Sequence, residues 1–367
     1  MRVGVPREIK VQEYRVGLTP TSVREVVAHG HQVLVERGAG AGIGAGDAAY
    51  EKAGAKIVED AFADADLIVK VKEPQPDERK RLREHHVLFT YLHLAPDAQQ
   101  ARDLVATGAV CIAYETVTRP GGGLPLLAPM SEVAGRMAIQ VGAGCLEKER
   151  GGMGTLLAGV PGVPAAKIVI LGAGVVGSNA ARIAVGSGAR VFALDRSVDA
   201  LRRVESEFGA RVVTVYSSRD AIEQHVLSAD LVIGAVLVPG AAAPRLVSQA
   251  LLKRMKPGAA LVDVSIDQGG CFETSRPTTH ADPTYVVDGV VHYCVANMPG
   301  AVPRTSTYAL NNATLPFVRA LADKGWARAL ADDLHLREGL NVARGKITYR
   351  AVAQALGLDY TPAESLL

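Results

Sequence analysis

The amino-acid sequence predicts an α/β protein built from two doubly wound, mainly parallel sheets. Two observations support this fold class. Short apolar segments with strand character alternate with amphipathic helical segments along most of the chain, and this alternation favours parallel βαβ units. The length of 367 residues is more than one hydrophobic core usually serves, so it favours two domains.

The first 125 residues or so predict a doubly wound sheet that has no phosphate-binding loop. A glycine-rich stretch at 38–44 follows a strand, but no long helix starts directly after it, so we interpret it as a surface loop. The expected strands are residues 2–5, 32–36, 67–71, 87–92 and 110–114, and the expected helices are residues 21–29, 47–53, 76–85 and 96–107.

A long helix is expected to lead out of this first region. Three glycines at 121–123 break the alternating pattern, and prolines at 125 and 129 end it. Ser131 is a suitable N-cap, and Glu132 would lie in the first helical turn. We therefore predict a helix that starts at Ser131, runs to about residue 150 and connects the domains.

A second long helix is expected at residues 305–324, after a proline-rich return, with shorter helices beyond it. The chain would then cross between the domains twice. We predict a substrate domain formed by residues 1–128 and 304–367, with a nucleotide-binding domain, residues 129–303, inserted in it. The default place for a ligand in such a protein is a cleft where the chain crosses.

Residues 167–195 predict a dinucleotide-binding motif. A β-branched strand at Lys167–Leu171 is followed by Gly-x-Gly-x-x-Gly and an Ala-rich helical segment. Gly172 permits the tight turn, Gly174 lets the backbone approach a pyrophosphate, and Gly177 lets the helix pack close to the strand. Asp195 ends the next strand, 21 residues after Gly174, where an acidic side chain accepts the ribose 2′-OH of NAD. Together these features predict a Rossmann-like domain that binds NAD.

The composition excludes several other classes of function. Apolar residues make up 48% of the chain and aromatic residues 5%, which suits cores of Val, Ile, Leu and Ala. A net charge of +2 gives no electrostatic reason to expect a nucleic acid or an anionic membrane as partner. No apolar stretch reaches the roughly 20 residues that span a bilayer. The four cysteines are far apart, so we expect no disulfide framework, no metal site and a reducing, cytoplasmic environment.

Four ionisable residues are placed where open α/β sheets bind their ligands. Lys72, His93 and Asp267 each follow the end of a predicted strand, and Arg15 lies in the polar loop before the first helix. A lysine and an arginine can bind a carboxylate, and a histidine can transfer a proton near neutral pH. Taken singly, Lys72 could be a solvated lysine, His93 a structural histidine and Asp267 a turn residue.

Several longer stretches carry a family resemblance. They are residues 2–6 with Arg15, 70–74, 92–94, 128–136, 159–163, the glycine-rich loop, 234–240, 267–271 and 296–299. With these stretches the chain resembles the bacterial L-alanine dehydrogenase family, which is related to the transhydrogenase α-subunits, along essentially its whole length. The resemblance implies reversible oxidative deamination of L-alanine to pyruvate and ammonium with NAD as cofactor. It also implies a homo-hexamer.

The same resemblance implies roles for individual residues. Arg15 and Lys72 would hold the substrate carboxylate, His93 would be the acid/base, and Asp267 would be the second catalytic group. One departure is Ala200, where some relatives carry a lysine near the adenine ribose; Arg196 could replace that cation or merely face solvent. The residues implied to bind the cofactor are Ser131, Gly172, Gly174, Val175, Val176, Gly177, Asp195, Ser217, Val236, Leu237, Val264, Ser265, Ile266, Asp267, Arg276, Val295, Ala296, Asn297 and Met298.

Three alternative functions differ from this one in ways that can be tested. The soluble subunit of a proton-translocating transhydrogenase exchanges hydride between two nicotinamides and needs no clamp for a substrate carboxylate. A saccharopine-type dehydrogenase would act on a larger amino acid. A nucleotide sensor would bind NAD without turnover. Arg15, Lys72, His93 and Asp267 together favour the amino-acid dehydrogenase over the transhydrogenase.

Overall fold

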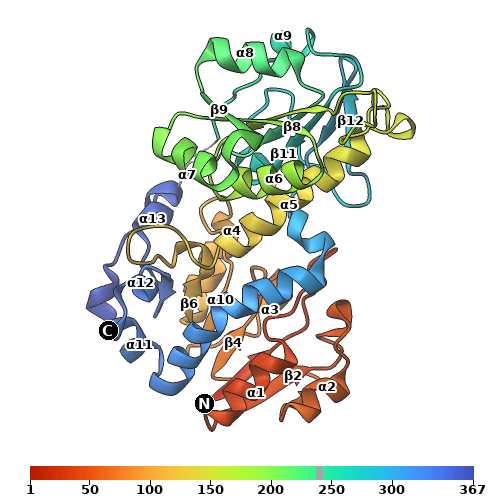
Figure 1. The fold of residues 1–367 in the computed structure, drawn as a ribbon. Coiled ribbons are helices and arrows are strands. Elements are labelled where there is room, and N and C mark those ends of the chain that lie inside the picture. Colours follow the sequence, from red (N-terminus) through yellow and green to blue (C-terminus); the bar gives the residue numbers. More distant parts are fainter. Residues whose placement is uncertain (237–242) are drawn as a thin grey trace. The chain divides into compact units, whose positions relative to one another are not determined.

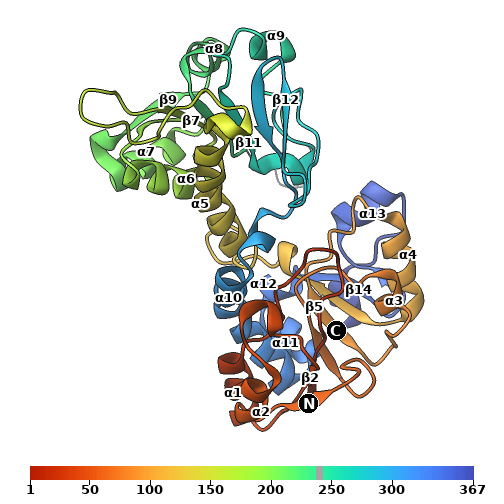
Figure 2. The same ribbon diagram turned by 90° about the vertical axis from the view of Figure 1, so that its right-hand side faces the viewer.

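The computed structural model describes residues 1–236 and 243–367, which divide into two compact units. Unit 1 comprises Met1–Met130 and Val302–Leu367, and unit 2 comprises Ser131–Ala301. Figures 1 and 2 show that each unit is built on a sheet of its own, with helices on the faces of that sheet. The predicted two-domain α/β fold with parallel sheets is therefore confirmed.

Unit 1 is built on an eight-stranded sheet. Its strands are β1 (Arg2–Val5), β2 (Gln32–Glu36), β3 (Lys56–Val58), β4 (Leu67–Val69), β5 (Val87–Thr90), β6 (Val110–Ala113), β14 (Leu340–Ala343) and β15 (Lys346–Ile347). Their order is β15-β14-β6-β5-β4-β1-β2-β3. The six strands β6-β5-β4-β1-β2-β3 run parallel. Strands β14 and β15 extend the sheet as an antiparallel edge.

The prediction of shorter helices after residue 324 is right for Trp326–Asp332, Leu334–Arg337 and Arg350–Leu356, but an antiparallel pair of strands lies among them. Leu340–Ala343 is a strand whose four residues are all buried, and it pairs with β6. The hairpin to β15 turns at Arg344 and Gly345, which both have positive φ angles of 49° and 77°. A four-residue segment is too short to show the period of a strand, so pairing with β6 decided its structure. The short strand β3 was not predicted either.

The helices of unit 1 follow the predicted pattern, with one clear exception. Thr19 and Asp97 cap the N-termini of the helices that follow them by accepting hydrogen bonds from Ser22 N and Gln100 N. The helix expected at 76–85 ends at Arg79, because the turn that follows is held by side chains, with Arg83 N donating to His86 Nδ1. The helices are α1 (Pro20–Ala28), α2 (Asp47–Lys52), α3 (Pro76–Arg79), α4 (Ala98–Thr107), α10 (Pro303–Lys324), α11 (Trp326–Asp332), α12 (Leu334–Arg337) and α13 (Arg350–Leu356), with 3₁₀ turns η1 (Ala41–Ile43), η2 (Tyr114–Thr116) and η7 (Ala363–Leu366).

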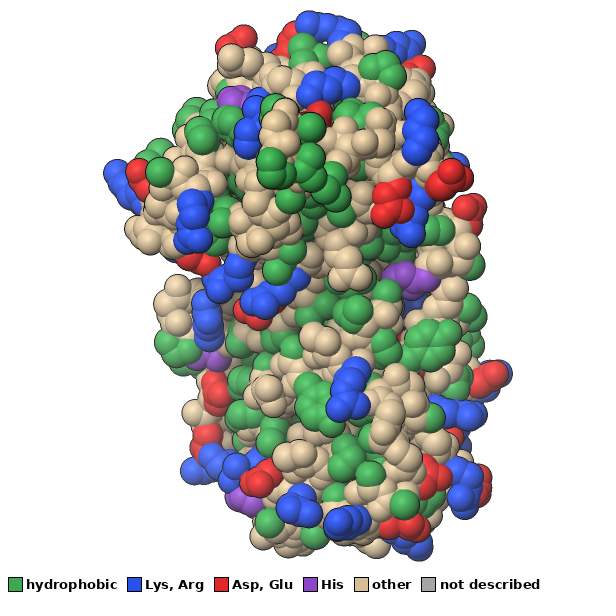
Figure 3. Space-filling model, turned by 45° about the vertical axis from the view of Figure 1, so that its right-hand side comes forward, with side chains coloured by type: hydrophobic (Ala, Val, Ile, Leu, Met, Phe, Trp, Pro, Cys, Tyr) green, Lys and Arg blue, Asp and Glu red, His purple; other side chains and the backbone are tan. Residues whose placement is uncertain are grey.

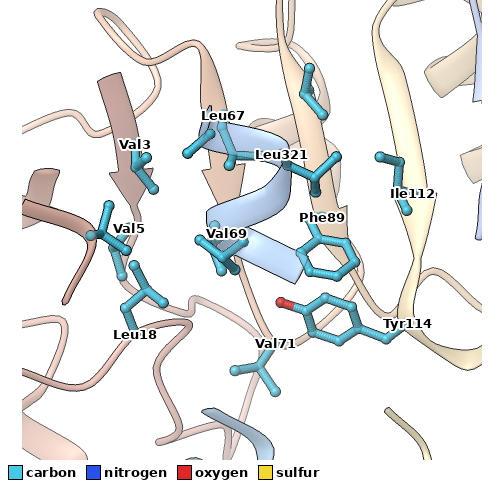
Figure 4. Packing of buried hydrophobic residues seen from close by; sticks show 14 of the residues in the cluster. Val3, Val5, Leu18, Leu67, Val69, Val71, Phe89, Ile112, Tyr114 and Leu321 are labelled. Atoms are coloured by element: carbon cyan, nitrogen blue, oxygen red, sulfur yellow. The ribbon is translucent and has the colours of Figure 1, made fainter. Parts of the chain in front are cut away.

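The sheet of unit 1 has a hydrophobic core on each face. On one face, side chains of the central strands pack against α1 and α10, and Figure 4 shows Val69 and Phe89 beside Leu321 of α10. The ring of Phe89 meets that of Tyr114 edge-on, with centroids 4.4 Å apart. On the other face, the core includes residues of α4 and α13. Burial on both faces explains why these strands read as continuous apolar runs.

Unit 2 is built on a seven-stranded sheet. Its strands are β7 (Lys167–Leu171), β8 (Arg190–Asp195), β9 (Val212–Tyr216), β10 (Leu231–Gly234), β11 (Ala260–Asp263), β12 (Thr284–Val287) and β13 (Val290–Tyr293). Their order is β12-β13-β11-β10-β7-β8-β9. All neighbours are parallel except β12, an unpredicted edge strand that forms an antiparallel hairpin with β13.

The long helix that leads into unit 2 begins earlier than predicted. It starts at Ala128, so Ser131 lies inside the first turns and is not its N-cap. Pro129 suits a first helical turn, where a missing N–H leaves no hydrogen bond unmade. The helices are α5 (Ala128–Cys145), α6 (Val175–Gly186), α7 (Val198–Phe208), α8 (Arg219–Ser228) and α9 (Gln249–Leu252), with 3₁₀ turns η3 (Lys148–Arg150), η4 (Gly209–Arg211), η5 (Val264–Gln268) and η6 (Met298–Ala301).

Charged side chains of both signs are interspersed over the face of the molecule in Figure 3, as the net charge of +2 leads one to expect. Within the described ranges, no helix combines the length and the apolar character that crossing a membrane requires.

A buried ion triad lies at the carboxyl end of β4. Lys70 Nζ lies 2.6 Å from Glu78 Oε1 and 3.1 Å from Glu8 Oε2, and all three side chains are buried. Burial alone would lower the pKa of Lys70, but the negative charges of Glu8 and Glu78 raise it, so the ammonium stays charged. The triad ties β4 to the loop after β1 and to the start of α3.

Replacing Lys70 should destabilise the protein strongly. Lys70→Met would leave two carboxylates buried without their cation, which typically costs about 3–5 kcal/mol. We expect a lower urea midpoint with an unchanged m-value. Lys80→Met is a matched control because Lys80 pairs with Asp77 on the exposed surface, and it should leave the midpoint almost unchanged. Equal midpoints for both variants would contradict a structural role of the triad.

Candidate active site

Each sheet has a point where the chain changes its winding direction. In unit 1, β1 has β2 on one side and β4 on the other, and in unit 2, β7 lies between β8 and β10. The loops that follow the two strands on either side of such a point diverge, and open α/β sheets bind ligands there, at the carboxyl ends of the strands. The predicted site residues of each unit follow strands of its sheet.

The glycine-rich loop of unit 2 fits a pyrophosphate. Gly172 has φ +109°, and a Cβ there would lie 2.5 Å from Ala235 O. A Cβ at Gly177 would lie 1.8 Å from Gly172 O, so this position requires glycine for packing of helix to strand. By contrast, a Cβ at Gly174 would meet no atom within 4 Å and would extend into open space. Helix α6 begins directly after Gly174, and no side chain caps it, so its first N–H groups are oriented for an anion.

Asp195 lies at the end of β8 beside this loop. Its Oδ2 accepts a hydrogen bond from Ala173 N at 2.7 Å, and its Oδ1 accepts one from Ser197 N at 2.7 Å. The carboxylate is thus fixed against the glycine-rich loop, which suits recognition of a ribose hydroxyl. Ala200, the position of the family departure, is buried in α7, whereas Arg196 is exposed.

The other predicted cofactor residues of unit 2 follow strand ends, except Ser131, which lies in α5. Ser217 follows β9, and Val236 follows β10 and accepts a hydrogen bond from Ser265 Oγ at 2.6 Å. Arg276 lies over the ring of Tyr285 at 4.2 Å. Leu237 was predicted to contact the cofactor as well, but it lies outside the described residues. The remaining predicted positions are Val264, Ser265, Ile266 and Asp267 in η5, Val295, Ala296, Asn297 and Met298 after β13, and Ser131 in α5.

A buried carboxylate holds the loop that carries Asp267. Asp263 accepts hydrogen bonds from Ser265 N at 3.0 Å, Cys271 N at 2.9 Å and Ser275 Oγ at 2.5 Å. Its burial raises the pKa of Asp263, and these hydrogen bonds oppose the shift. Asp267 itself is exposed in the 3₁₀ turn between these anchor points.

In unit 1, Lys72 is fixed through its backbone. Glu8 Oε1 accepts hydrogen bonds from Val71 N at 2.7 Å and from Lys72 N at 3.3 Å, and Thr90 Oγ1 donates to Lys72 O at 2.9 Å. These contacts join the chain after β1, the end of β4 and the end of β5. Lys72 therefore lies where the winding of this sheet changes direction.

Arg15 is buried and paired with Glu13, a residue that sequence reasoning missed. Arg15 is 3% exposed, and its Nε and Nη2 donate to the two oxygens of Glu13 at 2.7 and 2.6 Å. Its Nη1 lies 3.1 Å from the sulfur of Met130. Burial alone would raise the pKa of Glu13, but hydrogen bonds and positive charge from Arg15, together with the charge of Lys72, lower it to about 2. One carboxylate thus interacts with both predicted clamp cations.

His93 lies after β5 with an unusual backbone. Its φ angle is +49°, and its imidazole is 48% exposed and stacked at 5.8 Å on the ring of Tyr91. Glu115, from the turn after β6, accepts a hydrogen bond from His93 N at 2.6 Å. The structure therefore gathers Arg15, Lys72 and His93 at the strand ends of unit 1. Asp267 belongs to unit 2, with the predicted cofactor residues.

Comparisons with known proteins agree along the whole chain. A family model described as alanine dehydrogenase/PNT, N-terminal domain, matches residues 4–134, and the corresponding C-terminal domain model matches residues 138–350. Alanine dehydrogenase of Halomonas elongata is 61% identical over 370 residues, with 100% of both chains covered.

Solved structures give the same result. That of an L-alanine dehydrogenase matches with a TM-score of 0.94 at 52% identity, covering 97% of this chain and 99% of the other. That of a transhydrogenase from Sinorhizobium meliloti matches with a TM-score of 0.81 at 26% identity, covering 96% and 100%.

The Glu13–Arg15 pair should make stability depend on pH. The pKa of Glu13 is lowered from 4.5 to about 2 on folding, so the pair stabilises the folded state above about pH 4.5. That contribution, on the order of 3 kcal/mol, is lost as the pH falls through 2. We expect Glu13→Gln to be less stable than the unmodified protein at pH 7, with a gap in unfolding free energy that narrows below pH 4.5.

Urea titrations at several pH values measure this gap. Glu59→Gln serves as control because Glu59 pairs with Arg37 on the exposed surface, so it should show little difference at any pH. A gap for Glu13→Gln that stays constant from pH 7 to pH 2.5 would show that the carboxylate charge contributes nothing.

Proposed function

The chain belongs to the alanine dehydrogenase/PNT family, and on this basis we propose that it catalyses the reversible NAD-dependent oxidative deamination of L-alanine to pyruvate and ammonium. The observation that carries this proposal in the structure is the grouping of Arg15, Lys72 and His93 at the strand ends of unit 1. Two cations suit a carboxylate, and a histidine suits the proton that accompanies oxidation of an amine. The transhydrogenase alternative requires no such group, and the transhydrogenase match is a distant relative.

The proposal divides the work between the two parts of the chain. Substrate binding is assigned to the domain formed by residues 1–128 and 304–367, and NAD binding to residues 129–303. The open space at Gly174, the uncapped start of α6 and the fixed carboxylate of Asp195 support the assignment of the dinucleotide. Bound NAD would supply the acceptor for the hydride that leaves Cα of alanine.

The clamp residues would have different tasks. Lys72 would contact the substrate carboxylate as a point charge from its backbone-anchored position. The Nε–Nη2 edge of Arg15 is occupied by Glu13, so a substrate carboxylate cannot use that edge while the pair is intact. Arg15 would therefore contribute its charge and its Nη1 side, which lies by Met130.

His93 and Asp267 would handle protons. His93 would take up the proton released as alanine becomes the imino acid, and it would assist the water that then adds to the imine. Asp267 would orient the amine or that water. His93 is suited to both steps because imidazole exchanges protons near neutral pH.

Two further properties rest on the family resemblance. We propose that the protein is cytoplasmic, which its four buried, unpaired cysteines also favour. We also propose that it assembles as a homo-hexamer.

The decisive assay compares NADH oxidation with pyruvate and ammonium together and with each alone. We expect the absorbance of NADH to fall only when both are present, because the reverse reaction forms the amine from ammonium. Oxidation with pyruvate alone would contradict the proposal and indicate a 2-hydroxy-acid dehydrogenase. NADH binding without turnover on pyruvate or larger 2-oxo acids with ammonium would favour a nucleotide sensor.

Asp195 should determine the choice of NAD over NADP. A 2′-phosphate would meet its carboxylate, so we expect kcat/KM to favour NAD at least tenfold, or roughly 1.4 kcal/mol. Asp195→Ala should narrow this ratio, and exposed Arg196 should help by pairing with a phosphate. Asp199→Ala removes a nearby exposed carboxylate that pairs with Arg202, and it should leave the ratio unchanged. A ratio near one for the unmodified protein would refute this role for Asp195.

A further inference from the structure

Glu115 accepts the backbone N–H groups that lead into His93. It lies in η2, the turn directly after β6, and its side chain is 15% exposed. Both of its oxygens lie 3.2 Å from Leu92 N, and Oε1 lies 2.6 Å from His93 N. One carboxylate thus makes three contacts with two successive N–H groups. These contacts join the turn after β6 to the end of β5.

These contacts hold a backbone conformation that a histidine rarely adopts. The φ angle of His93 is +49°, in the left-handed region that side chains with a Cβ disfavour. On the other side of the same segment, Gln100 Nε2 donates to Leu92 O at 2.6 Å. The direction of the His93 side chain therefore depends on the preceding peptide groups, whose N–H groups donate to Glu115 and whose Leu92 O accepts from Gln100.

The Glu115 carboxylate also faces the imidazole. Its Oε1 lies 4.0 Å from His93 Nδ1, within the range of an ion pair but too far for a hydrogen bond. The ring of Tyr91 stacks on the imidazole, and burial keeps the pKa of Tyr91 well above neutral pH, with Arg15 opposing this shift. Tyr349 interacts with Glu115, and burial raises the pKa of that phenol too. Both phenols stay uncharged at neutral pH, so the negative charge against this side of His93 comes from Glu115.

We propose that Glu115 is the positioning residue of His93: its carboxylate holds the backbone at Leu92 and His93, and it thereby orients the imidazole with Nε2 toward the substrate. This inference rests on the proposed function, in which His93 is the acid/base. Nδ1 faces Glu115, so Nε2, on the opposite side of the ring, is the nitrogen that exchanges the proton. Glu115 transfers no proton itself.

The test uses Glu115→Gln and Glu115→Asp in the full-length protein, with His93→Ala as reference. Glu115→Gln removes the charge and replaces one acceptor oxygen by a donor. We expect kcat to fall at least tenfold, but less than for His93→Ala, for which roughly 10²–10⁴-fold is expected. The KM for alanine and the affinity for NADH, measured by fluorescence titration, should change less than threefold, since Glu115 contacts neither ligand in this proposal.

The pH profile separates positioning from a merely structural role. Glu115→Gln leaves the imidazole in the chain but removes the acceptor that orients it, so the His93 limb of kcat/KM for alanine should remain visible while kcat falls. Glu115→Asp keeps the charge and should keep the limb close to its original pH while recovering only part of kcat. Asp66→Asn is a matched control, because Asp66 accepts Arg2 N at the opposite end of the strands, and it should change neither quantity.

The possible outcomes are distinct. If the unmodified protein shows no turnover that depends on both pyruvate and ammonium, the proposed function fails and the premise of this inference with it. If the unmodified protein is active, and Glu115→Gln has the same kcat and the same pH limb of kcat/KM as the unmodified protein, the inference alone is overturned. Loss of the limb in Glu115→Gln but not in His93→Ala would also overturn it, since Glu115 would then be the acid/base. If Glu115→Gln does not fold, the Asp variant decides: full kcat at every pH would contradict the inference.

Discussion

Carboxylates that accept backbone N–H groups at strand ends hold both candidate sites in place. Where a parallel sheet ends, N–H groups of the following loops lose their partners in the sheet, and leaving them buried and unpaired is unfavourable. Glu8, Asp195 and Glu115 each come from one strand end and accept N–H groups from the loop after a neighbouring strand. Asp263 does the same within its own loop. The positions of Lys72, His93 and the glycine-rich loop depend on these contacts.

These carboxylates lose contact with water on folding, and the protein offsets this loss of hydration in different ways. Glu8 shares the buried ammonium of Lys70, and Glu13 is held by the guanidinium of Arg15. Asp195 and Glu115 keep some exposure to solvent. Asp263 relies on hydrogen-bond donors, and its pKa is raised by burial. Paired charges favour one arrangement of the strand ends, because a carboxylate displaced from its cation would be buried alone.

Sequence reasoning placed the candidate site residues on the fold better than the residues that support them. Lys72, His93 and Asp195 follow apolar strands, so a strand pattern predicts their place. Glu8 and Glu115 contact N–H groups 63 and 22 residues away along the chain, and no local spacing indicates such a pairing. Ser131 appeared to be an N-cap because serine is favoured there, but Pro129 allowed the helix to begin earlier.

The sequence by itself determined the two-domain α/β fold, the central strands and the glycine-rich loop, because apolar period and glycine requirements are local. Gly177 must be glycine for a reason that a short segment already contains, because a Cβ there would meet Gly172 O. Only the tertiary structure decided that Leu340–Ala343 is a strand, since its partner β6 is more than 200 residues earlier in the chain. It also decided that Glu13 pairs with Arg15 and that Glu115 accepts the backbone N–H of His93. These side chains meet because the sheet brings distant strand ends side by side, and hydrogen bonds then fix charged groups that no linear pattern connects.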